Sequence, residues 1–470
     1  MRYHDGDTIA AISTAFAQAG IGIVRVSGRQ SIGIVDSIFC ARDGIKLADH
    51  LTHTIHYGWI VQPSSGTATI TAGRREIIDE VLVTIMRAPR TFTREDVIEI
   101  NCHGGTVALR RVLELVLDSG ARIAQPGEFT RRAFLNGRID LSQAEAVVDI
   151  IKAKTDAALA AGMQQLTGVL SNHIMVLRTQ LLSVLAAIEA RIDFPEEDIP
   201  DTDTMRLRTQ IASIEKELTR LLTRSHLGRI VREGVRAVIC GRPNVGKSSL
   251  LNALLQKERS IVTPVAGTTR DVIEDYIDIK GIPVRIMDTA GLLEPRDLVE
   301  RKAVAKAKEC IRQADLILLV LDGRMPLDVQ TRSLMRMVGQ AKTVIVINKI
   351  DLKRKLRRED FLDKFAQVVE VSAKRLKNIE SLEAAIYSLV MGGGIEDAEP
   401  FFVSNLRHIQ ELKAAQKSVA CALHSLDNGL SVEFSAQHIK DALGAFDELL
   451  GRRFSEDLLD NIFSQFCIGK

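Results

Sequence analysis

Residues 241–248 constrain the fold of this chain more strongly than any other stretch. They read Gly-Arg-Pro-Asn-Val-Gly-Lys-Ser and match the phosphate-binding loop pattern G-x-x-x-x-G-K-[ST]. The apolar run before them, Val235–Cys240, predicts a buried strand, and residues 249–255 predict the start of a helix. The backbone N–H groups of such a loop, together with the helix N-terminus, hold phosphate oxygens. We expect Lys247 to reach the β- and γ-phosphates of a nucleotide and the Ser248 hydroxyl to ligate Mg²⁺.

A second motif follows a predicted strand at residues 284–287. This strand ends in Asp288-Thr289-Ala290-Gly291. An acidic residue at a strand end can hold Mg²⁺ through water, and the Gly291 N–H can meet the γ-phosphate.

Two further motifs predict the choice of base. The apolar strand at residues 343–347 ends in Asn348-Lys349-Ile350-Asp351, and residues 368–371 lead into Ser372-Ala373-Lys374. The Asp351 carboxylate can accept hydrogen bonds from guanine N1–H and N2–H₂, whereas adenine would present an acceptor to it, so GTP is favoured over ATP. The second motif is similar to the loop whose backbone contacts guanine O6. Because the motifs occur in order and each follows a strand, the sequence predicts a GTPase domain.

The segment Thr-Pro-Val-Ala-Gly-Thr-Thr-Arg-Asp at residues 263–271 has the position of a first switch. Thr268 and Thr269 are both candidates for the Mg²⁺-ligating threonine, and Thr269 is preferred. The expected nucleotide contacts are Asn244, Val245, Gly246, Lys247, Ser248, Ser249, Thr263, Thr268, Thr269, Asp288, Thr289, Ala290, Gly291, Asn348, Lys349, Asp351, Ser372, Ala373 and Lys374.

Leu292 follows Gly291, where Ras-type enzymes have a glutamine that orients the attacking water. Another group must therefore position the water and stabilise the transition-state charge. A monovalent cation held by Asn244 could take the place of an arginine finger, or Asn244 could be a turn residue that tolerates unusual backbone angles. The residue alone leaves both interpretations open.

Composition bounds the class of protein. The chain has 470 residues, enough for about two to four domains. Its 62 Lys+Arg and 60 Asp+Glu give no global basic footprint. The six cysteines form no C-x-x-C pair, so we expect most of them to be small core residues in a reducing, cytoplasmic setting. The N-terminus lacks a signal-peptide pattern, and no apolar run reaches the ~18 residues expected of a membrane span.

Changes of pattern divide the chain. Strand-like runs at residues 22–26, 80–86 and 97–101 and a helical run at Thr106–Asp118 predict an α+β domain over residues 1–121. Helical spacing from Leu166 to Ile188 predicts the first half of a helical domain over residues 122–230. The expected GTPase domain, with a doubly wound sheet, spans residues 231–395, and helical spacing returns over residues 396–470. We expect α/β plus all-α architecture, with the GTPase domain inserted into a helical domain whose two halves pack together.

One family resembles the chain from end to end. Residues 126–141 read PGEFTRRAFLNGRIDL and are followed by QAEA at 143–146; residues 92–99 read FTREDVIE, with HGG at 103–105; the last residues are FCIGK. These segments resemble the tRNA modification GTPase family MnmE, also called TrmE. The long segment at 126–141 is far more specific than the phosphate-binding loop.

The resemblance implies a reaction and its partners. Family members act as homodimers with a FAD-dependent partner, MnmG (GidA). Together they add a (carboxymethyl)aminomethyl group to C5 of the wobble uridine, U34, of certain tRNAs. The one-carbon unit comes from a tetrahydrofolate (5-formyl- or 5,10-methylene-tetrahydrofolate) bound in the N-terminal domain, which also dimerises. No membrane is implied.

The resemblance also implies site residues. Folate contacts would be Arg25, Glu99 and Arg138, with Lys470 nearby; Arg138 stands where the family commonly has lysine. Potassium ligands would be Asn244, Thr263, Val265 and Thr268. Catalytic roles would fall on Lys247, on Glu300 as general base or water-positioning group, and on Cys467. The loop at residues 16–20 reads Phe-Ala-Gln-Ala-Gly and departs from the family's glycine-rich pattern.

Two other functions fit the nucleotide motifs. One is a regulatory or ribosome-assembly GTPase that performs no covalent chemistry on RNA. The other is a scaffold that passes nucleotide state to an RNA-modifying partner. The segment at residues 126–141 and the terminal Cys467 favour tRNA modification.

Overall fold

The computed structural model describes residues 6–62, 76–193, 201–257, 276–287, 309–339, 342–392 and 403–470, with no side chains for 201–204. These residues form two compact units. The first, here unit 1, contains the chain up to Val148 together with Leu450–Lys470, and the second, unit 2, contains the described residues from Asp149 to Leu449.

Unit 1 is built on a seven-stranded sheet in the order β3-β4-β5-β6-β2-β1-β7. Neighbouring strands are antiparallel, except that β1 and β7 are parallel. The strands are β1 (Ile9–Ile12), β2 (Ile21–Ser27), β3 (Phe39–Ala41), β4 (Thr54–Val61), β5 (Ile77–Met86), β6 (Val97–His103) and β7 (Arg122–Ile123). Alternate residues of β2 and β6, such as Val24 and Ile100, are buried beneath α1 (Ser31–Ile38) and α2 (Thr106–Asp118).

The end of the chain completes unit 1. Helix α14 (Glu456–Phe463) packs with α3 (Glu128–Leu135) and with the start of α4 (Leu141–Lys152). Phe134, Leu141 and Phe463 belong to their shared core. This packing places the last residues of the chain beside the segment 126–135.

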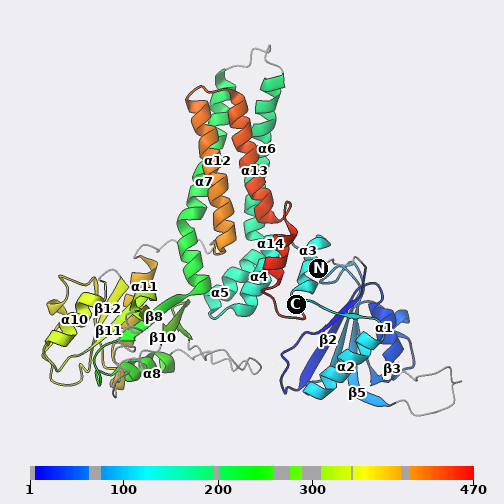
Figure 1. Cartoon of the computed structure of the whole chain (residues 1–470), viewed down its shortest axis with the longest axis horizontal. Helices are drawn as coiled ribbons and strands as arrows, with labels where there is room; N and C mark the ends of the chain where they lie inside the picture. The colour runs from blue at the N-terminus through cyan, green and yellow to red at the C-terminus, as the bar shows by residue number, and fades with distance from the viewer. Residues whose placement is uncertain are drawn as a thin grey trace. The chain divides into compact units, whose positions relative to one another are not determined.

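Unit 2 contains a helical bundle made from both sides of the GTPase region, as expected (Figure 1). Its helices are α5 (Asp156–Leu166), α6 (Val169–Asp193), α7 (Asp201–Glu233), α12 (Leu406–Asp427) and α13 (Val432–Leu450). Helix α12 packs along α7, and ion pairs join Arg178 to Asp447 (2.7 Å) and Arg208 to Asp427 (2.6 Å). The predicted helical spacing is interrupted at Gly168, so Leu166 ends α5 and does not begin α6.

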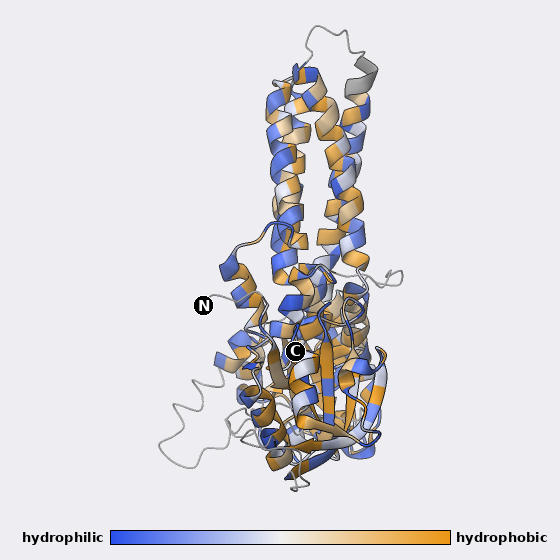
Figure 2. Cartoon of the chain, turned by 90° about the vertical axis from the view of Figure 1, so that its right-hand side faces the viewer, coloured by the Kyte–Doolittle hydropathy of each residue, from blue (hydrophilic) through white to orange (hydrophobic). Residues whose placement is uncertain are grey.

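Among the described helices, α6 is long and apolar enough to cross a membrane by length and composition, with a mean hydropathy of 1.3 over its most apolar stretch of 18 residues. The sequence predicts no uninterrupted apolar run of ~18 residues, and α6 contains none; it qualifies by the mean hydropathy of a window that includes polar residues. A core helix of a bundle passes the same test, and α6 packs against α5 and α7. Hydrophilic and hydrophobic residues mix along the long bundle helices (Figure 2).

The GTPase region forms a six-stranded sheet in the order β13-β12-β11-β8-β10-β9, parallel except for β9. The strands are β8 (Val235–Cys240), β9 (Tyr276–Ile279), β10 (Ile282–Met287), β11 (Leu316–Asp322), β12 (Thr343–Asn348) and β13 (Gln367–Glu370). Successive residues of β11 enter different cores: Leu318 packs with α8 (Lys247–Lys257) and α11 (Ile379–Met391), and Leu319 packs on the side of α10 (Val329–Met337). Both faces are covered, which confirms the doubly wound fold.

Candidate functional site

The phosphate-binding loop connects β8 to α8, which begins at Lys247. Gly246 has φ +99°, and a Cβ built there would lie 2.3 Å from Asn348 Nδ2, so only glycine fits. Lys247 Nζ donates hydrogen bonds to the carbonyls of Gly241 (3.2 Å) and Arg242 (3.0 Å). This holds the ammonium group against the loop.

The loop residues expected to supply ligands are mostly exposed. Asn244, Ser248 and Ser249 are exposed, whereas Val245 is buried and anchors the loop in the core. Asn244 has φ +62°, a left-handed conformation that asparagine tolerates better than most residues. The turn-residue interpretation of Asn244 is therefore true of its backbone, and its exposed side chain is still free to bind a cation.

Asn348 links three parts of the site. Its Nδ2 donates to the Val245 carbonyl (2.9 Å), and its Oδ1 accepts from the N–H groups of Ala373 (3.0 Å) and Lys349 (2.8 Å). The residue is 2% exposed. Asn348 is thus a buried residue that fixes the position of the phosphate-binding loop relative to the Ser372–Lys374 loop.

Asp322, at the end of β11, is a residue that the sequence motifs did not identify. Its Oδ2 accepts from Lys349 Nζ (2.7 Å), and the same Nζ donates to the Asn244 carbonyl (2.5 Å). Burial would raise the pKa of Asp322, but hydrogen bonds from Arg324 and Lys349 outweigh it and hold the pKa well below its usual value. Asp322 therefore stays ionised and positions Lys349 along the loop.

The side chain of Asp351, the expected guanine ligand, is hydrogen-bonded to Ser372 of the Ser372–Lys374 loop. The Ser372 hydroxyl donates to Asp351 Oδ1 (2.6 Å), and this hydrogen bond lowers the pKa of the carboxyl group. The carboxylate is thus ionised and oriented by a residue of the adjacent loop.

The site lies at the carboxyl edge of the sheet, where such folds bind ligands. Its residues end or follow parallel strands: Gly241, Asp322, Asn348 and Ser372.

Several expected contacts lie outside the described residues. They are the switch and metal candidates Thr263, Val265, Thr268 and Thr269, the motif Asp288, Thr289, Ala290 and Gly291, the neighbouring Leu292, and Glu300.

In unit 1 the structure brings together three of the four expected folate contacts. Arg25 on β2 and Glu99 on β6 are cross-strand partners, and Arg25 Nε and Nη2 both lie 2.8 Å from Glu99 Oε1. Arg25 Nη1 also donates to the Gly469 carbonyl (3.3 Å), next to Lys470. The pair is about one-fifth exposed, which leaves it accessible to a ligand.

The chain terminus is fixed at this pair by backbone contacts. The Phe129 N–H donates to the Lys470 carbonyl (3.2 Å), and the Ser13 hydroxyl donates to the Gly469 carbonyl (3.2 Å). Gly469 has φ +94°, and a Cβ built there would lie 2.3 Å from the Ile12 carbonyl oxygen. Glycine is thus needed for the tail to lie against β1.

The fourth candidate, Arg138, lies over the Phe92 ring (4.9 Å to the centroid), and Arg25 lies over the Phe129 ring (5.7 Å). Phe92 and Phe129 belong to one small core cluster. Arg138 and Arg25 are therefore connected through two aromatic rings. Both rings lie in family motifs, but the sequence alone predicted no role for them.

The expectation that most cysteines are core residues is wrong. Cys102 and Cys240 are buried, but Cys40 and Cys467 are exposed and Cys310 and Cys421 are intermediate. All six are free thiols. Cys467 is accessible and its carbonyl accepts from the Gly127 N–H (3.4 Å), which ties it to the segment 126–135.

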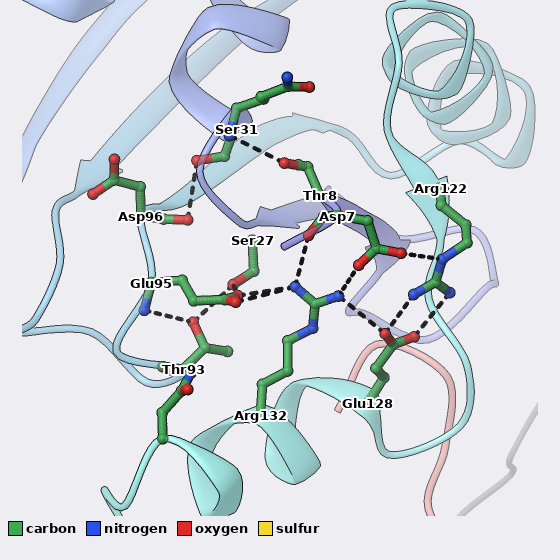
Figure 3. Close-up of polar contacts among 12 residues, drawn as sticks. Asp7, Thr8, Ser27, Ser31, Thr93, Glu95, Asp96, Arg122, Glu128 and Arg132 are labelled. Atoms are coloured by element: carbon green, nitrogen blue, oxygen red, sulfur yellow. Dashed lines mark hydrogen bonds and ion pairs between the residues drawn. The ribbon is translucent and has the colours of Figure 1, made fainter. Parts of the chain in front are cut away.

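The segment 126–135 also contains a charged network (Figure 3). Glu128, whose side chain is 0% exposed, accepts from Arg122 Nη2 (2.6 Å) and from Arg132 Nη2 (3.1 Å). Arg132 in turn contacts Asp7 (2.5 Å) and Glu95 (3.1 Å). The network joins α3 to β7 and to the segments that carry Asp7 and Glu95.

Sheet order, phosphate-binding loop and the motifs at its carboxyl edge together define a P-loop GTPase. Two family models match the chain: one described as MnmE helical domain, over residues 141–467, and one described as GTP-binding protein TrmE N-terminus, over residues 8–138. The chain belongs to the MnmE (TrmE) family of tRNA modification GTPases.

Curated relatives cover the chain from end to end. It is 46% identical over 467 residues to the tRNA modification GTPase MnmE of Geobacillus kaustophilus, covering 99% of each chain. It is 43% identical over 469 residues to that of Staphylococcus aureus, covering 99% of this chain and 100% of the relative. Among solved structures, the G domain of the T. maritima FeoB iron transporter is 26% identical, covers 33% of this chain and 98% of its own, and has a TM-score of 0.26.

Proposed function

We propose that this GTPase, as a homodimer in the cytoplasm, works with the FAD-dependent partner MnmG (GidA) on tRNA. Together they add a (carboxymethyl)aminomethyl group to C5 of U34. The one-carbon unit comes from 5-formyl- or 5,10-methylene-tetrahydrofolate. The observation that carries the proposal is the meeting of the C-terminal tail, with Cys467 and Lys470, and the Arg25–Glu99 pair in one unit.

The chemistry of these residues fits a folate. A pterin offers N–H donors, for which Glu99 supplies a carboxylate. Arg25 contacts the Oε1 atom of this carboxylate through Nε and Nη2. The glutamate tail carries carboxylates, for which Arg138 and Lys470 supply cations. The Phe92 and Phe129 rings add an apolar wall beside the two arginines.

The described part of the nucleotide site offers oxygen ligands of the kinds that Mg²⁺ and K⁺ bind. Ser248 presents its hydroxyl at the start of α8 for Mg²⁺, with Thr269 as the proposed second ligand. Asn244 offers an exposed amide oxygen for K⁺, with Thr263, Val265 and Thr268 completing the proposed set. A bound K⁺ would supply positive charge to the transition state, the role that an arginine finger has in other GTPases.

Two residues are proposed for the chemical steps. Glu300 would position the attacking water in GTP hydrolysis, a role that Leu292 cannot perform. Cys467 would support the transfer to uridine, and its exposure on the tail agrees with this role. The rival proposal is a regulatory GTPase without covalent RNA chemistry. Such a function requires no ligand at the Arg25–Glu99 pair or at the C-terminal tail.

Tetrahydrofolate titration of the full chain separates these proposals. Deleting residues 468–470 or replacing Arg25 by Met should weaken tetrahydrofolate binding at least about tenfold, because a charge-assisted hydrogen bond contributes about 1.5–3 kcal/mol. Arg110→Met, on the exposed face of α2, is the matched control. Equal dissociation constants for all variants, with folding checked by circular dichroism, would favour the regulatory GTPase.

A further inference from the structure

Three metal-ligand side chains meet in unit 1, apart from the sites described above. Asp43 follows β3, His50 follows the 3₁₀ turn η1 (Leu47–Asp49), and His56 lies in β4. One ligand atom from each lies within 4.8 Å of the other two. Because β3 pairs with β4, the loop between them returns His50 to His56, and the two imidazole rings stack with centroids 3.5 Å apart.

His50 has an unused nitrogen that points to a ligand. Its Nε2 is buried and has no hydrogen-bond partner among the described residues, while Asp43 Oδ2 lies 3.8 Å away. A buried polar atom without a partner costs about 1–3 kcal/mol. A cation between this nitrogen and the carboxylate would satisfy both.

His56 is held in the tautomer that a metal ligand needs. The Thr54 hydroxyl gives its single proton to the Leu51 carbonyl (2.6 Å), so it must accept from His56 Nε2–H (2.8 Å). The lone pair of His56 is then on Nδ1. Metal-bound histidines commonly donate their other N–H in this way.

We propose that Asp43, His50 and His56 bind a transition-metal dication of the zinc class. Two imidazole nitrogens and one carboxylate suit zinc and its neighbours better than Mg²⁺. With metal–ligand bonds of about 2.0–2.2 Å, tetrahedral ligand atoms lie ~3.4 Å apart. The His50–Asp43 distance is close to this value. The in-plane lone pairs of the two stacked rings point side by side, so binding requires one imidazole to rotate out of the stack and the half-exposed Asp43 to move toward it. The bound metal would tie the β3–β4 loop to the sheet.

Cobalt titration of the full chain tests the site directly. Excess Mg²⁺ and GDP fill the nucleotide site first. Trp59, the single tryptophan, lies three residues from His56 on β4, ~10 Å along the strand, so Co²⁺ bound at the cluster should quench its fluorescence and Zn²⁺ should reverse the quenching. Visible cobalt bands without a thiolate charge-transfer band would exclude the cysteines as ligands.

Matched variants decide the assignment. Asp43→Asn and His56→Gln should each weaken Co²⁺ binding at least about tenfold, since even outer-shell changes cost that much. His53→Gln, an exposed histidine that bonds Thr52 and Arg90, should not. Equal affinity in wild type and both ligand variants, an equal loss in the control, or no Co²⁺ binding by wild type would overturn the proposal. If His56→Gln fails to fold, the half-exposed Asp43→Asn carries the test.

Discussion

Asn348 Nδ2 lies 2.9 Å from the Val245 carbonyl oxygen and joins the guanine-specificity motif to the phosphate-binding loop. Its Oδ1 simultaneously accepts from Ala373 N–H. One buried side chain therefore sets the relative position of the base-binding and phosphate-binding segments.

Asn348→Ala should weaken GTP and GDP binding by at least about tenfold, because it leaves two buried backbone groups unpaired at about 1–3 kcal/mol each. Isothermal titration with both nucleotides measures this. Arg336→Ala, in the last turn of α10, serves as control. Unchanged nucleotide affinity in Asn348→Ala would show that the two loops hold their positions without it.

Asp351→Asn should shift base preference from guanine toward xanthine, since the amide offers a donor where the carboxylate accepts. Competition between GTP and XTP measures the shift. Ser372→Ala, which removes only the hydroxyl that orients Asp351, should lower affinity without changing the preferred base. A preference for GTP that survives in Asp351→Asn would contradict the assignment.

Hydrolysis should be faster in K⁺ than in Na⁺, and Asn244→Ala should erase the difference, because the proposed cation supplies the positive charge that an arginine finger gives other GTPases. Steady-state hydrolysis in the two chlorides at equal ionic strength measures this. Equal hydrolysis rates for the wild type in the two salts would contradict a role for K⁺. A K⁺ effect that is retained in Asn244→Ala would contradict the assignment of Asn244 as its ligand.

Glu128→Gln should lower the free energy of unfolding of unit 1 by about 3 kcal/mol, because it removes one partner of a buried charged network. Burial raises the pKa of Glu128, but bonds from Arg122 and from the Gln125 N–H outweigh it and the pKa is lowered. The stabilisation is therefore complete above the unfolded value of about 4.3 and lost as the pH falls through the folded pKa.

Trp59 fluorescence follows the unfolding of unit 1, and the difference between wild type and Glu128→Gln should vanish at low pH. Glu114→Gln, in an exposed pair with Arg110 on α2, should cost under about 0.5 kcal/mol. A pH-independent difference would assign the cost to packing and not to charge.

Local patterns predicted the elements that have clear ends. The helix Thr106–Asp118 and the strand Val235–Cys240 are confirmed at both bounds. The patterns did not predict β4, because its buried and exposed residues do not alternate. They also did not predict β11, an apolar run that ends at Asp322 and is followed by no recognised motif.

The site was predictable where its residues are neighbours in sequence. Arg25 and Gly469 are 444 positions apart, so their contact depends on how α3 and α14 pack, and no local pattern shows it. Asp322 contacts Lys349 and Phe129 contacts Arg25, partners that are distant in sequence, and for this reason neither residue was assigned a role.

The central claim is that this chain modifies wobble uridine with a folate-derived carbon. Mass spectrometry of U34 in tRNA from cells lacking the protein, restored with wild type or with Cys467→Ser, tests it most directly. The account predicts unmodified U34 without the protein and with Cys467→Ser, and the C5-substituted uridine with wild type. The same U34 composition in all three would contradict it.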